Sequence, residues 1–275
     1  METIGLIAGN GRFPVLFARA ARARGLRVVA VAHRGETEPD LEREADSVTW
    51  VRVGQVGRVI RALKAGGVSR AVMAGGVNKV RSMFSLRPDW RAMRLLGRAA
   101  GRGDDALLRA VSAELESEGI EIVPSTVFLQ DIVVERGHLA GPPLSEREAA
   151  DVRLGCRVLA ALGPLDIGQC VVVERGVVLA IEAVEGTDRT IERGGSLGTG
   201  RAVVIKAAKT GQDMRFDVPA VGPRTIETMV RSGAGVLAVQ AGATIMLEGE
   251  RLIEMAARQG ITVVGCDEHG NVGQS

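Results

Sequence analysis

The chain has few of the histidine and aromatic side chains on which many catalytic and binding sites depend. Its 275 residues include no tyrosine and only three histidines, and aromatic residues make up 3% of the total. A zinc site built on histidines, or a Ser-His-Asp triad, would need residues that are barely available here. Carboxylate chemistry remains, and it favours a hard cation such as magnesium or manganese. So few aromatic side chains disfavour a stacking platform for single-stranded nucleic acid, and we expect no nucleic-acid partner.

Cysteine spacing and apolar runs bear on location. The three cysteines, Cys156, Cys170 and Cys266, are far apart and form no CxxC pair, so each is expected to be a small core residue. No apolar run approaches the roughly 18 to 20 residues of a membrane-spanning helix, and residues 1–11 lack a signal-peptide pattern. We therefore expect a cytoplasmic protein. With 46% apolar residues, a chain of this length forms two domains more readily than one.

The net charge of +2 hides an asymmetry between the two halves of the chain. Residues 1–130 hold 20 Lys and Arg and 14 Asp and Glu, a balance of +6. The remainder holds 15 and 19, a balance of −4. The N-terminal half is therefore the one expected to attract anions.

Two glycine turns follow strand patterns in the N-terminal half. A strand pattern over residues 4–8 is followed by a GNG turn and a helical pattern to about residue 24, and a strand pattern over 69–74 runs into a GGVN turn. Glycines let a ligand approach the backbone, and a helix N-terminus offers free N–H groups to a phosphate. We predict nucleotide or phosphate contacts at Gly9, Asn10, Gly11, Gly75, Gly76 and Asn78. For Gly9 and Gly11, an ordinary tight turn between strand and helix is an equally good interpretation.

The first glycine turn resembles a dinucleotide-binding fingerprint, but the fingerprint is incomplete. Its pattern is GxGxxP, and the strand over 27–32 leads into His33 and Arg34, where NAD binding requires an acidic residue. NADP is less easily excluded, because Arg34 could meet a 2′-phosphate. An NADP-dependent oxidoreductase and a non-catalytic nucleotide-binding regulatory module therefore stay open as alternatives.

The most basic part of the chain lies between residues 79 and 109. A helix predicted over 88–100 would place Arg91, Arg94 and Arg98 on one face. Trp90 and Met93 would lie on the neighbouring face with residue 86. This arrangement suits an amphiphilic ligand or an anionic membrane surface. The alternative is a solvated charged face beside an ordinary core stripe.

A break in the pattern divides the chain into two domains. Residues 135–144 are rich in glycine and proline and predict a linker, after which Ser145 and Glu148 form a capping box that begins a helix to about residue 162. Strand patterns over 169–173 and 177–184 predict a hairpin, and another strand covers 202–205. We predict an α/β protein with an N-terminal Rossmann-like parallel-sheet domain over 1–134 and a C-terminal α/β domain over 145–275.

Acidic and basic residues recur together at the predicted strand ends of the C-terminal domain. One set is acidic and consists of Glu182, Glu185 and Asp188, and the second set consists of Lys206, Lys209 and Asp217. Because sequential strands are usually neighbours, we expect the two sets to lie close together. Lysines neutralise phosphate oxygens and carboxylates hold divalent cations, so the combination suits phosphoryl chemistry. The alternative is a charged turn and a helix cap formed by Thr187 or Asp188.

Six motifs in order resemble one family across essentially the whole chain. They are IGLIAGNGRFP (4–14), AGGVNK (74–79), RGDDALLR (102–109), LDIGQ (165–169), LAIEAVEGTD (179–188) and FDVPAVGPRTIE (216–227). Each motif alone is weak, and the glycine turns are shared by many folds. Together they are similar to the two-domain, LpxI-type family of metal-dependent UDP-2,3-diacylglucosamine pyrophosphatases, which acts in lipid A biosynthesis.

The resemblance implies hydrolysis of the substrate's diphosphate to UMP and 2,3-diacylglucosamine 1-phosphate with Mg²⁺ or Mn²⁺. It also implies that the aspartate of the FDVPAVG motif, Asp217, is essential. We expect Lys206 and Lys209 to share the catalytic role, and Asp217, Glu185 and Asp188 to hold the metal. Further substrate-binding residues are expected at Asp104, Asp105, Gln169, Gly186 and Thr187.

The expected partner is the lipid substrate UDP-2,3-diacylglucosamine. Because such a substrate resides in a membrane, transient contact with the cytoplasmic face of the inner membrane is expected. A homodimer is left open.

Overall fold

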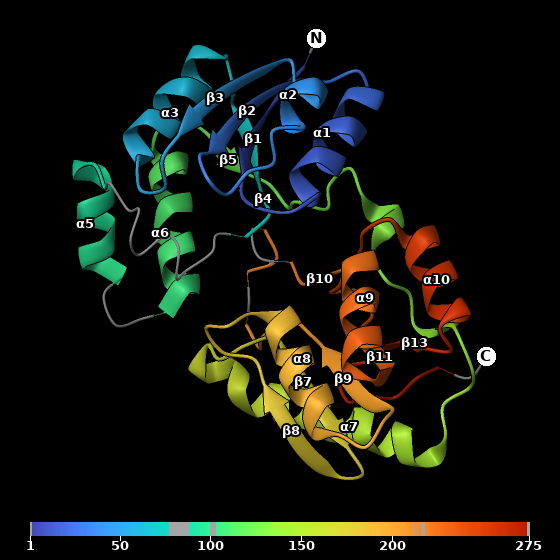
Figure 1. The fold of residues 1–275 in the computed structure, drawn as a ribbon. Helices are drawn as coiled ribbons and strands as arrows, with labels where there is room; N and C mark the ends of the chain where they lie inside the picture. The colour runs from blue at the N-terminus through green and yellow to red at the C-terminus, as the bar shows by residue number, and fades with distance from the viewer. Residues whose placement is uncertain (1, 77–87, 100–102, 212, 216–217, 274–275) are drawn as a thin grey trace. The chain divides into compact units, whose positions relative to one another are not determined.

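The chain folds into two α/β units, shown in Figure 1. The computed structural model describes residues 2–76, 88–99, 103–211, 213–215 and 218–273, with only the backbone described at 98, 99 and 103–105. Contacts divide the chain between residues 130 and 131, and they group the short segment that begins at Asp213 with the first unit. The predicted fold class, two α/β domains with a parallel sheet in the first, is confirmed.

The first unit is a parallel sheet with helices on both faces. Its five strands lie in the order β3-β2-β1-β4-β5. They are β1 (Thr3–Ala8), β2 (Arg27–His33), β3 (Ser47–Val51), β4 (Arg70–Ala74) and β5 (Glu121–Ile122). The helices are α1 (Phe13–Ala23), α2 (Leu41–Glu44), α3 (Val56–Ala65), α5 (Trp90–Ala99) and α6 (Gly103–Ser117). Figure 1 shows α1 and α2 on one side of the sheet and α3 and α6 on the other.

Burial on both faces explains the apolar runs of this sheet. Strand β2 reads RVVAVAH, and its five central residues are buried. Val29 and Val31 pack against Leu63 of α3 and Leu115 of α6, while Phe17 of α1 is fully buried. Central parallel strands covered by helices on both sides lose the alternation of one-sided sheets. The strands predicted over 4–8, 27–32 and 69–74 are confirmed to within one residue.

The second unit has a mixed sheet in the order β6-β13-β11-β9-β7-β8. Its strands are β6 (Gly137–Ala140), β7 (Cys170–Glu174), β8 (Val177–Ile181), β9 (Ala202–Lys206), β11 (Ala234–Gln240) and β13 (Thr262–Cys266). Strands β10 (Ala220–Val221) and β12 (Ile245–Met246) form a separate short pair. The helices are α7 (Glu146–Leu162), α8 (Thr187–Leu197), α9 (Pro223–Ser232) and α10 (Gly249–Arg258).

Alternating side chains of this sheet feed two cores. Val171 and Ile205 point to the side of α7, where Cys156 is buried. Val172 and Val204 point to the opposite core, which α8, α9 and α10 complete. The predicted capping box begins α7: the Ser145 hydroxyl accepts from the Glu148 backbone N–H, and the Glu148 carboxylate accepts from the Ser145 N–H. The predicted hairpin is confirmed as antiparallel β7 and β8.

The segment predicted as a linker, residues 135–144, contains a strand. Gly137–Ala140 forms β6, which pairs antiparallel with β13 at the edge of the second sheet. Glycine and proline mark turns at both ends of this short strand, and its pairing partner lies more than a hundred residues away. Local composition therefore could not show that the segment belongs to the sheet. No helix in the described part of the chain is long and apolar enough to cross a bilayer.

Candidate functional site

Strand ends of the second unit meet at one edge of its sheet. Strand β9 ends at Lys206, which lies opposite Cys170 at the start of β7. On the other side of β7, the Glu182 N–H donates to the Cys170 carbonyl oxygen at 2.9 Å. Since β7 runs antiparallel to both neighbours, its start lies beside their ends. The sheet thus places Glu182 and Lys206 on either side of Cys170.

A chain of hydrogen bonds joins these strand ends to helix α8. The Lys206 ammonium donates to the Thr187 hydroxyl at 2.9 Å, and that hydroxyl donates to Glu182 Oε1 at 3.1 Å. The second Glu182 oxygen accepts from the Gln169 N–H at 3.2 Å. Lys206 is only 8% exposed. A buried ammonium needs nearby acceptors, and the hydroxyl and carboxylate meet that need.

The turn before α8 positions Thr187. Gly186 is the N-cap residue with φ of 83°, a left-handed conformation that favours glycine. Thr187 therefore opens the helix, where unpaired N–H groups and the positive end of the dipole favour an anion. Four predicted site residues, Gln169, Gly186, Thr187 and Lys206, come together with Glu182 in this way, because they lie on adjoining elements.

Lys209 has a separate partner. Its ammonium lies 2.5 Å from Asp166 Oδ1, and both side chains are largely buried. The backbone between the two lysines is held by bonds from the Ala207 N–H to the Gln169 carbonyl and from the Ala208 N–H to Gln240 Oε1. Asp166 was missed as a site residue, although it lies in the LDIGQ motif, because only the fold brings residue 166 to residue 209.

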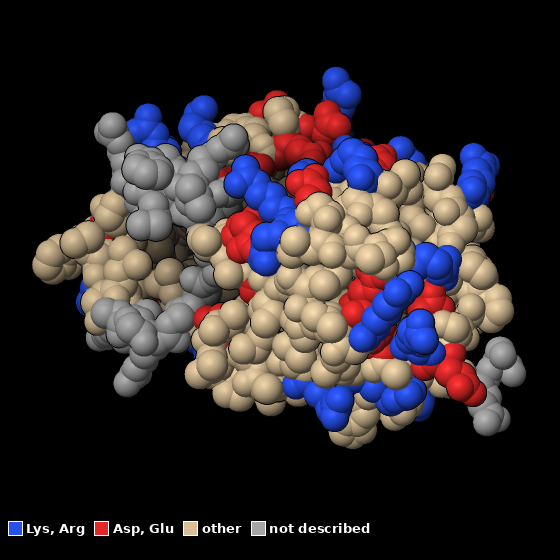
Figure 2. Space-filling view, turned by 60° about the horizontal axis from the view of Figure 1, so that its bottom comes forward, with Lys and Arg blue, Asp and Glu red and all other residues tan. Residues whose placement is uncertain are grey.

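Two of the three carboxylates predicted as metal ligands, Glu185 and Asp188, each bond an arginine. Arg193 donates to Glu185 at 2.5 Å and holds the pKa of that carboxyl below its ordinary value, and Arg224 lies 2.7 Å from Asp188. Figure 2 shows the same pattern more widely, with basic and acidic side chains side by side on the face it presents. Among the described residues, no group of three or more His, Cys, Asp or Glu could hold a metal ion.

Two predicted site residues, Asp217 and Asn78, lie outside the described part of the chain. Asp104 and Asp105 are described only as backbone in the first turn of α6. Just before Asp217, Arg215 bonds Asp213 and also lies 2.9 Å from Glu116 of α6. The hydrogen bond from Arg215 lowers the pKa of the Asp213 carboxyl. The segment leading to the FDVPAVG motif is thus held by charge pairs within the first unit.

In the first unit, the two glycine turns contact each other. Strands β1 and β4 are parallel neighbours, and after them the Gly9 N–H donates to the Ala74 carbonyl at 2.8 Å and the Asn10 N–H to the Gly76 carbonyl at 2.7 Å. A Cβ at Gly9 would lie 2.3 Å from the Gly76 oxygen. In the strand order this is the point where the chain switches from one side of β1 to the other, the usual place for a ligand in such sheets.

Strand β2 ends in a neutral histidine at the same edge, and an acidic side chain follows the strand. The buried Ala8 carbonyl oxygen accepts from the Thr37 hydroxyl at 2.6 Å. His33 Nδ1 lies 2.9 Å from the same oxygen, so Nδ1 must carry the ring proton. Burial lowers the pKa of His33, so the ring is no cation for a phosphate. Glu36 accepts from Asn10 Nδ2 at 3.2 Å. Sequence reasoning missed Glu36 because it follows the strand by three residues.

The three cysteines are packing residues, and only Cys170 lies beside the site. All three are free thiols in the cores, as predicted. Burial raises the pKa of Cys170 well above its ordinary value, and the nearby Glu182 adds to that effect. Its thiol therefore stays neutral between Glu182 and Lys206, and it contributes no nucleophile.

The fold and its strand ends define a two-domain α/β protein with a glycine-rich sheet edge in one unit and a buried lysine at a strand end in the other. The chain belongs to the LpxI family: the family's N-terminal domain matches residues 3–132 and its C-terminal domain matches residues 135–264. The family suggested by the six motifs is confirmed.

One relative matches along its whole length. The UDP-2,3-diacylglucosamine pyrophosphatase LpxI of Caulobacter vibrioides is 35% identical over 279 residues, covering 97% of this chain and 98% of the relative. Solved structures are far less similar. The biotin carboxylase subunit of a pyruvate carboxylase is 15% identical with a TM-score of 0.27, covering 67% of this chain and 39% of that one. A TM-score this low supports no functional argument.

Proposed function

We propose that this protein is a hydrolase that cleaves the diphosphate of UDP-2,3-diacylglucosamine, releasing UMP and 2,3-diacylglucosamine 1-phosphate. The observation that carries the proposal is the chain of hydrogen bonds from the buried Lys206 through Thr187 to Glu182, in a protein whose relative along the whole chain bears that enzyme's name. Family membership favours this function over the oxidoreductase and the regulatory module that the glycine turns left open.

The residues of the second unit suit a developing phosphate charge. The Lys206 ammonium, held by Thr187, neutralises phosphate oxygens at the N-terminus of α8. Glu182 orients the hydroxyl so that its lone pairs face the ammonium. Lys209 supplies a second cation, and Asp166 fixes its position. Positioned cations lower the barrier because they need no reorganisation during the reaction.

The glycine edge of the first unit suits the nucleotide half of the substrate. Gly9 and Gly75 allow the two turns to pack closely against each other at the switch between β1 and β4. Glu36, beside Asn10, offers a carboxylate that can accept from a ribose hydroxyl. Because His33 is neutral, binding at this edge depends on N–H groups and the α1 terminus.

A divalent cation, Mg²⁺ or Mn²⁺, is proposed as the cofactor on the strength of the family resemblance. When bound it would polarise the diphosphate and lower the pKa of a bound water. The described carboxylates alone do not fit such an ion, since Glu185 and Asp188 are each bonded to an arginine. We therefore assign no step to the ion, and Asp217 is the residue we propose as its ligand or as the group that orients water.

Turnover by the purified full-length protein tests the proposal. We expect UMP and the diacylglucosamine phosphate to appear by mass spectrometry with Mn²⁺ or Mg²⁺, and to disappear with excess EDTA. Hydrolysis in ¹⁸O-labelled water would show which phosphorus is attacked. Absence of any product with either metal would contradict the function, and full activity in EDTA would contradict the cofactor.

Asp217→Asn is expected to cause the largest loss of activity. Replacing the carboxylate with an amide of the same size should lower kcat by roughly 10³-fold, the scale at which loss of a transition-state contact is felt. Asp213→Asn is the matched control, because Asp213 lies in the same segment and bonds Arg215. A turnover of Asp217→Asn within a few fold of the unaltered protein would remove Asp217 from the mechanism.

A further inference from the structure

The chain between the two lysines of the second unit leaves the sheet after Lys206. That residue is the last in β9, where it lies opposite Cys170 of β7 and Val239 of β11. Lys209 follows beyond the strand and bonds Asp166. Strand pairing therefore fixes Lys206, whereas contacts beyond the regular ladder are needed to fix the chain as far as Lys209.

Two hydrogen bonds carry the ladder past the end of β9. The Ala207 N–H donates to the Gln169 carbonyl oxygen on the β7 side at 3.0 Å. The Ala208 N–H donates to Gln240 Oε1 on the β11 side at 2.9 Å. Successive N–H groups of a strand point to opposite neighbours, so the alternation of β9 continues past its end. On the β11 side, a side-chain oxygen takes the place of a backbone carbonyl.

The backbone of Gln240 is held in place by β13 and by a turn. Gln240 is the last residue of β11 and lies opposite Cys266 of β13, and the Ala241 N–H donates to the Cys266 carbonyl oxygen at 2.8 Å. The Thr244 N–H donates to the Gln240 carbonyl oxygen at 3.1 Å, which closes the turn. The carbonyl is thus engaged in the turn, and the side-chain amide accepts from Ala208 out of a fixed backbone position.

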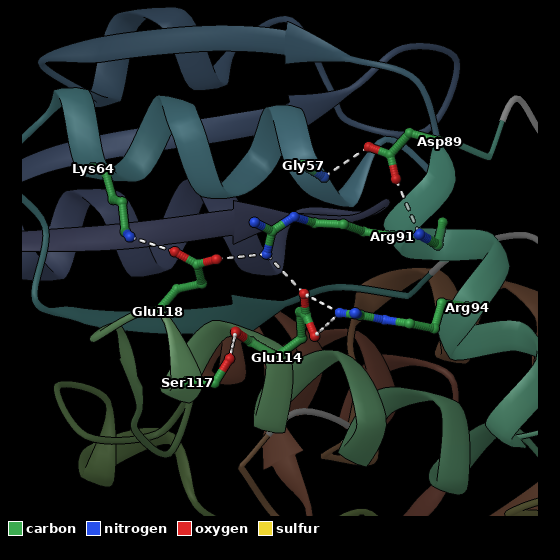
Figure 3. A network of polar contacts seen from close by, with 9 residues as sticks. Gly57, Lys64, Asp89, Arg91, Arg94, Glu114, Ser117 and Glu118 are labelled. Carbon is green, nitrogen blue, oxygen red and sulfur yellow. Dashed lines mark hydrogen bonds and ion pairs between the residues drawn. The ribbon is translucent and has the colours of Figure 1, made fainter.

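The first unit contains a tie of the same kind, which Figure 3 shows. One oxygen of Asp89 accepts from the Gly57 N–H at 2.7 Å and so joins the start of α5 to α3. Arg91 and Arg94 of α5 bond Glu114 of α6 at 2.7 and 3.0 Å, and they clamp α5 to that helix. A side-chain oxygen on a backbone N–H can thus fix a neighbouring element. Here the element is a helix without predicted site residues, whereas at Gln240 it is the chain between two of them.

We propose that Gln240 is a positioning residue for the two lysines: its amide oxygen holds the chain at Ala208, so that Lys206 and Lys209 keep the spacing at which both ammoniums act on one diphosphate. The inference rests on the proposed function and adds a residue that acts through the backbone. Positioned charges stabilise a transition state because they need no reorganisation, and a small displacement of such a group slows the reaction. Binding of the substrate depends less on the spacing, since either ammonium can neutralise a phosphate by itself.

Gln240→Leu tests the proposal because it removes the acceptor and keeps the approximate size of the side chain. We expect kcat for UMP release to fall about tenfold and KM to change by less than about twofold. Hydrogen exchange at Ala208, followed by mass spectrometry of the peptide that contains it, should become faster because the N–H loses its acceptor. Gln240→Glu keeps an acceptor oxygen, so it should restore slow exchange and most of kcat, while its added charge raises KM.

Thr262→Val is the matched control at the opposite end of the same sheet. The Thr262 hydroxyl is fully buried and donates to the Pro142 carbonyl oxygen at 2.8 Å, so this variant also loses a bond between a side chain and the backbone. We expect a lower melting temperature in both Thr262→Val and Gln240→Leu. Only Gln240→Leu should lower kcat, because a bond at the start of β13 lies far from the strand ends that carry the lysines.

The measurements separate the tie from the reaction. Equal losses of kcat in Gln240→Leu and Thr262→Val would overturn the proposal by assigning the effect to general stability. Faster exchange in Gln240→Leu with normal kcat would overturn it by removing the tie from the reaction, and unchanged exchange would show that the tie is not made. If the unaltered protein released no UMP, although Gln240→Leu accelerated exchange, the proposed function would fail and the tie would stand.

Discussion

The two sheet edges that we propose as the substrate site are built in opposite ways. In the first unit, backbone groups of Gly9, Gly75 and Gly76 form the edge, and the histidine beside them is neutral. In the second unit, side chains of Lys206 and Glu182 form it, joined by the Thr187 hydroxyl. The first edge consists mainly of backbone groups because its glycines have no side chains, whereas the second edge contains a buried lysine ammonium.

In the proposed reaction, this difference would separate substrate binding at the first edge from catalysis at the second. A backbone edge can hold a phosphate or ribose without charge of its own, and Gly9 and Gly75 tolerate no added Cβ because the two turns already touch. A buried ammonium stabilises charge that develops during a reaction, since low local dielectric strengthens the interaction. We therefore expect changes at the first edge to alter stability and KM, and changes at the second to alter kcat.

Lys206→Met gives the strongest test of this contrast. The change keeps most of the side-chain length but removes the ammonium, and we expect kcat to fall by about 10²-fold with little change in KM. Steady-state UMP release measures both constants. Arg258→Met, at an exposed arginine of α10, controls for loss of a positive charge. If Lys206→Met raised KM alone, the second edge would be a binding edge and the contrast would fail.

Gly9→Ala probes the first edge. The new Cβ would lie 2.3 Å from the Gly76 carbonyl oxygen, so the turns must separate, and we expect the free energy of unfolding to fall. A loss of about 2–4 kcal/mol is typical of such overpacking. Gly11→Ala, where φ is 79° but nothing lies within 4 Å, should lose only about 1 kcal/mol. Urea denaturation measures both, and equal losses would show that the contact between turns is unimportant.

His33 gives the smallest effect, a change in the pH dependence of stability. Because burial lowers its pKa in the folded state, the unfolded chain takes up the proton first as pH falls through about 6.5. Stability should therefore decline from that pH downward, towards the lower folded pKa. In His33→Asn this part of the decline should be absent by thermal denaturation, whereas the exposed His269→Gln should behave like the unaltered protein. A variant that declined identically would mean that His33 is not held neutral.

Local patterns predicted most elements because their causes are local. The run over 27–33 predicts a buried strand, and the Ser145 and Glu148 spacing predicts a helix start; both are confirmed. The glycine pattern also predicted that residues 9 and 75 would follow strands, and β1 and β4 end just before them. Each signal depends on residues within one turn or strand.

The contacts that escaped prediction join distant parts of the chain. Strand β6 needs β13, Lys209 needs Asp166, and the arginine partners of Glu185 and Asp188 lie on α8 and α9. In the sequence, Arg193 and Arg224 are indistinguishable from ordinary surface arginines. The local pattern therefore does not indicate that they pair with Glu185 and Asp188. The predicted roles of Asp217 and of the metal stay predictions.

The sequence by itself determined the two α/β units, the glycine turns and the family, because periodicity, turn residues and motif order are properties of short segments. Only the tertiary structure decided which charged side chains form ion pairs with one another and which can still interact with a ligand. Arg91 and Arg94 became clamps and Trp90 became exposed, while Lys206 was buried against Thr187. Pairing and burial depend on where the sheets and helices bring distant residues, and these interactions decide what each charge can do.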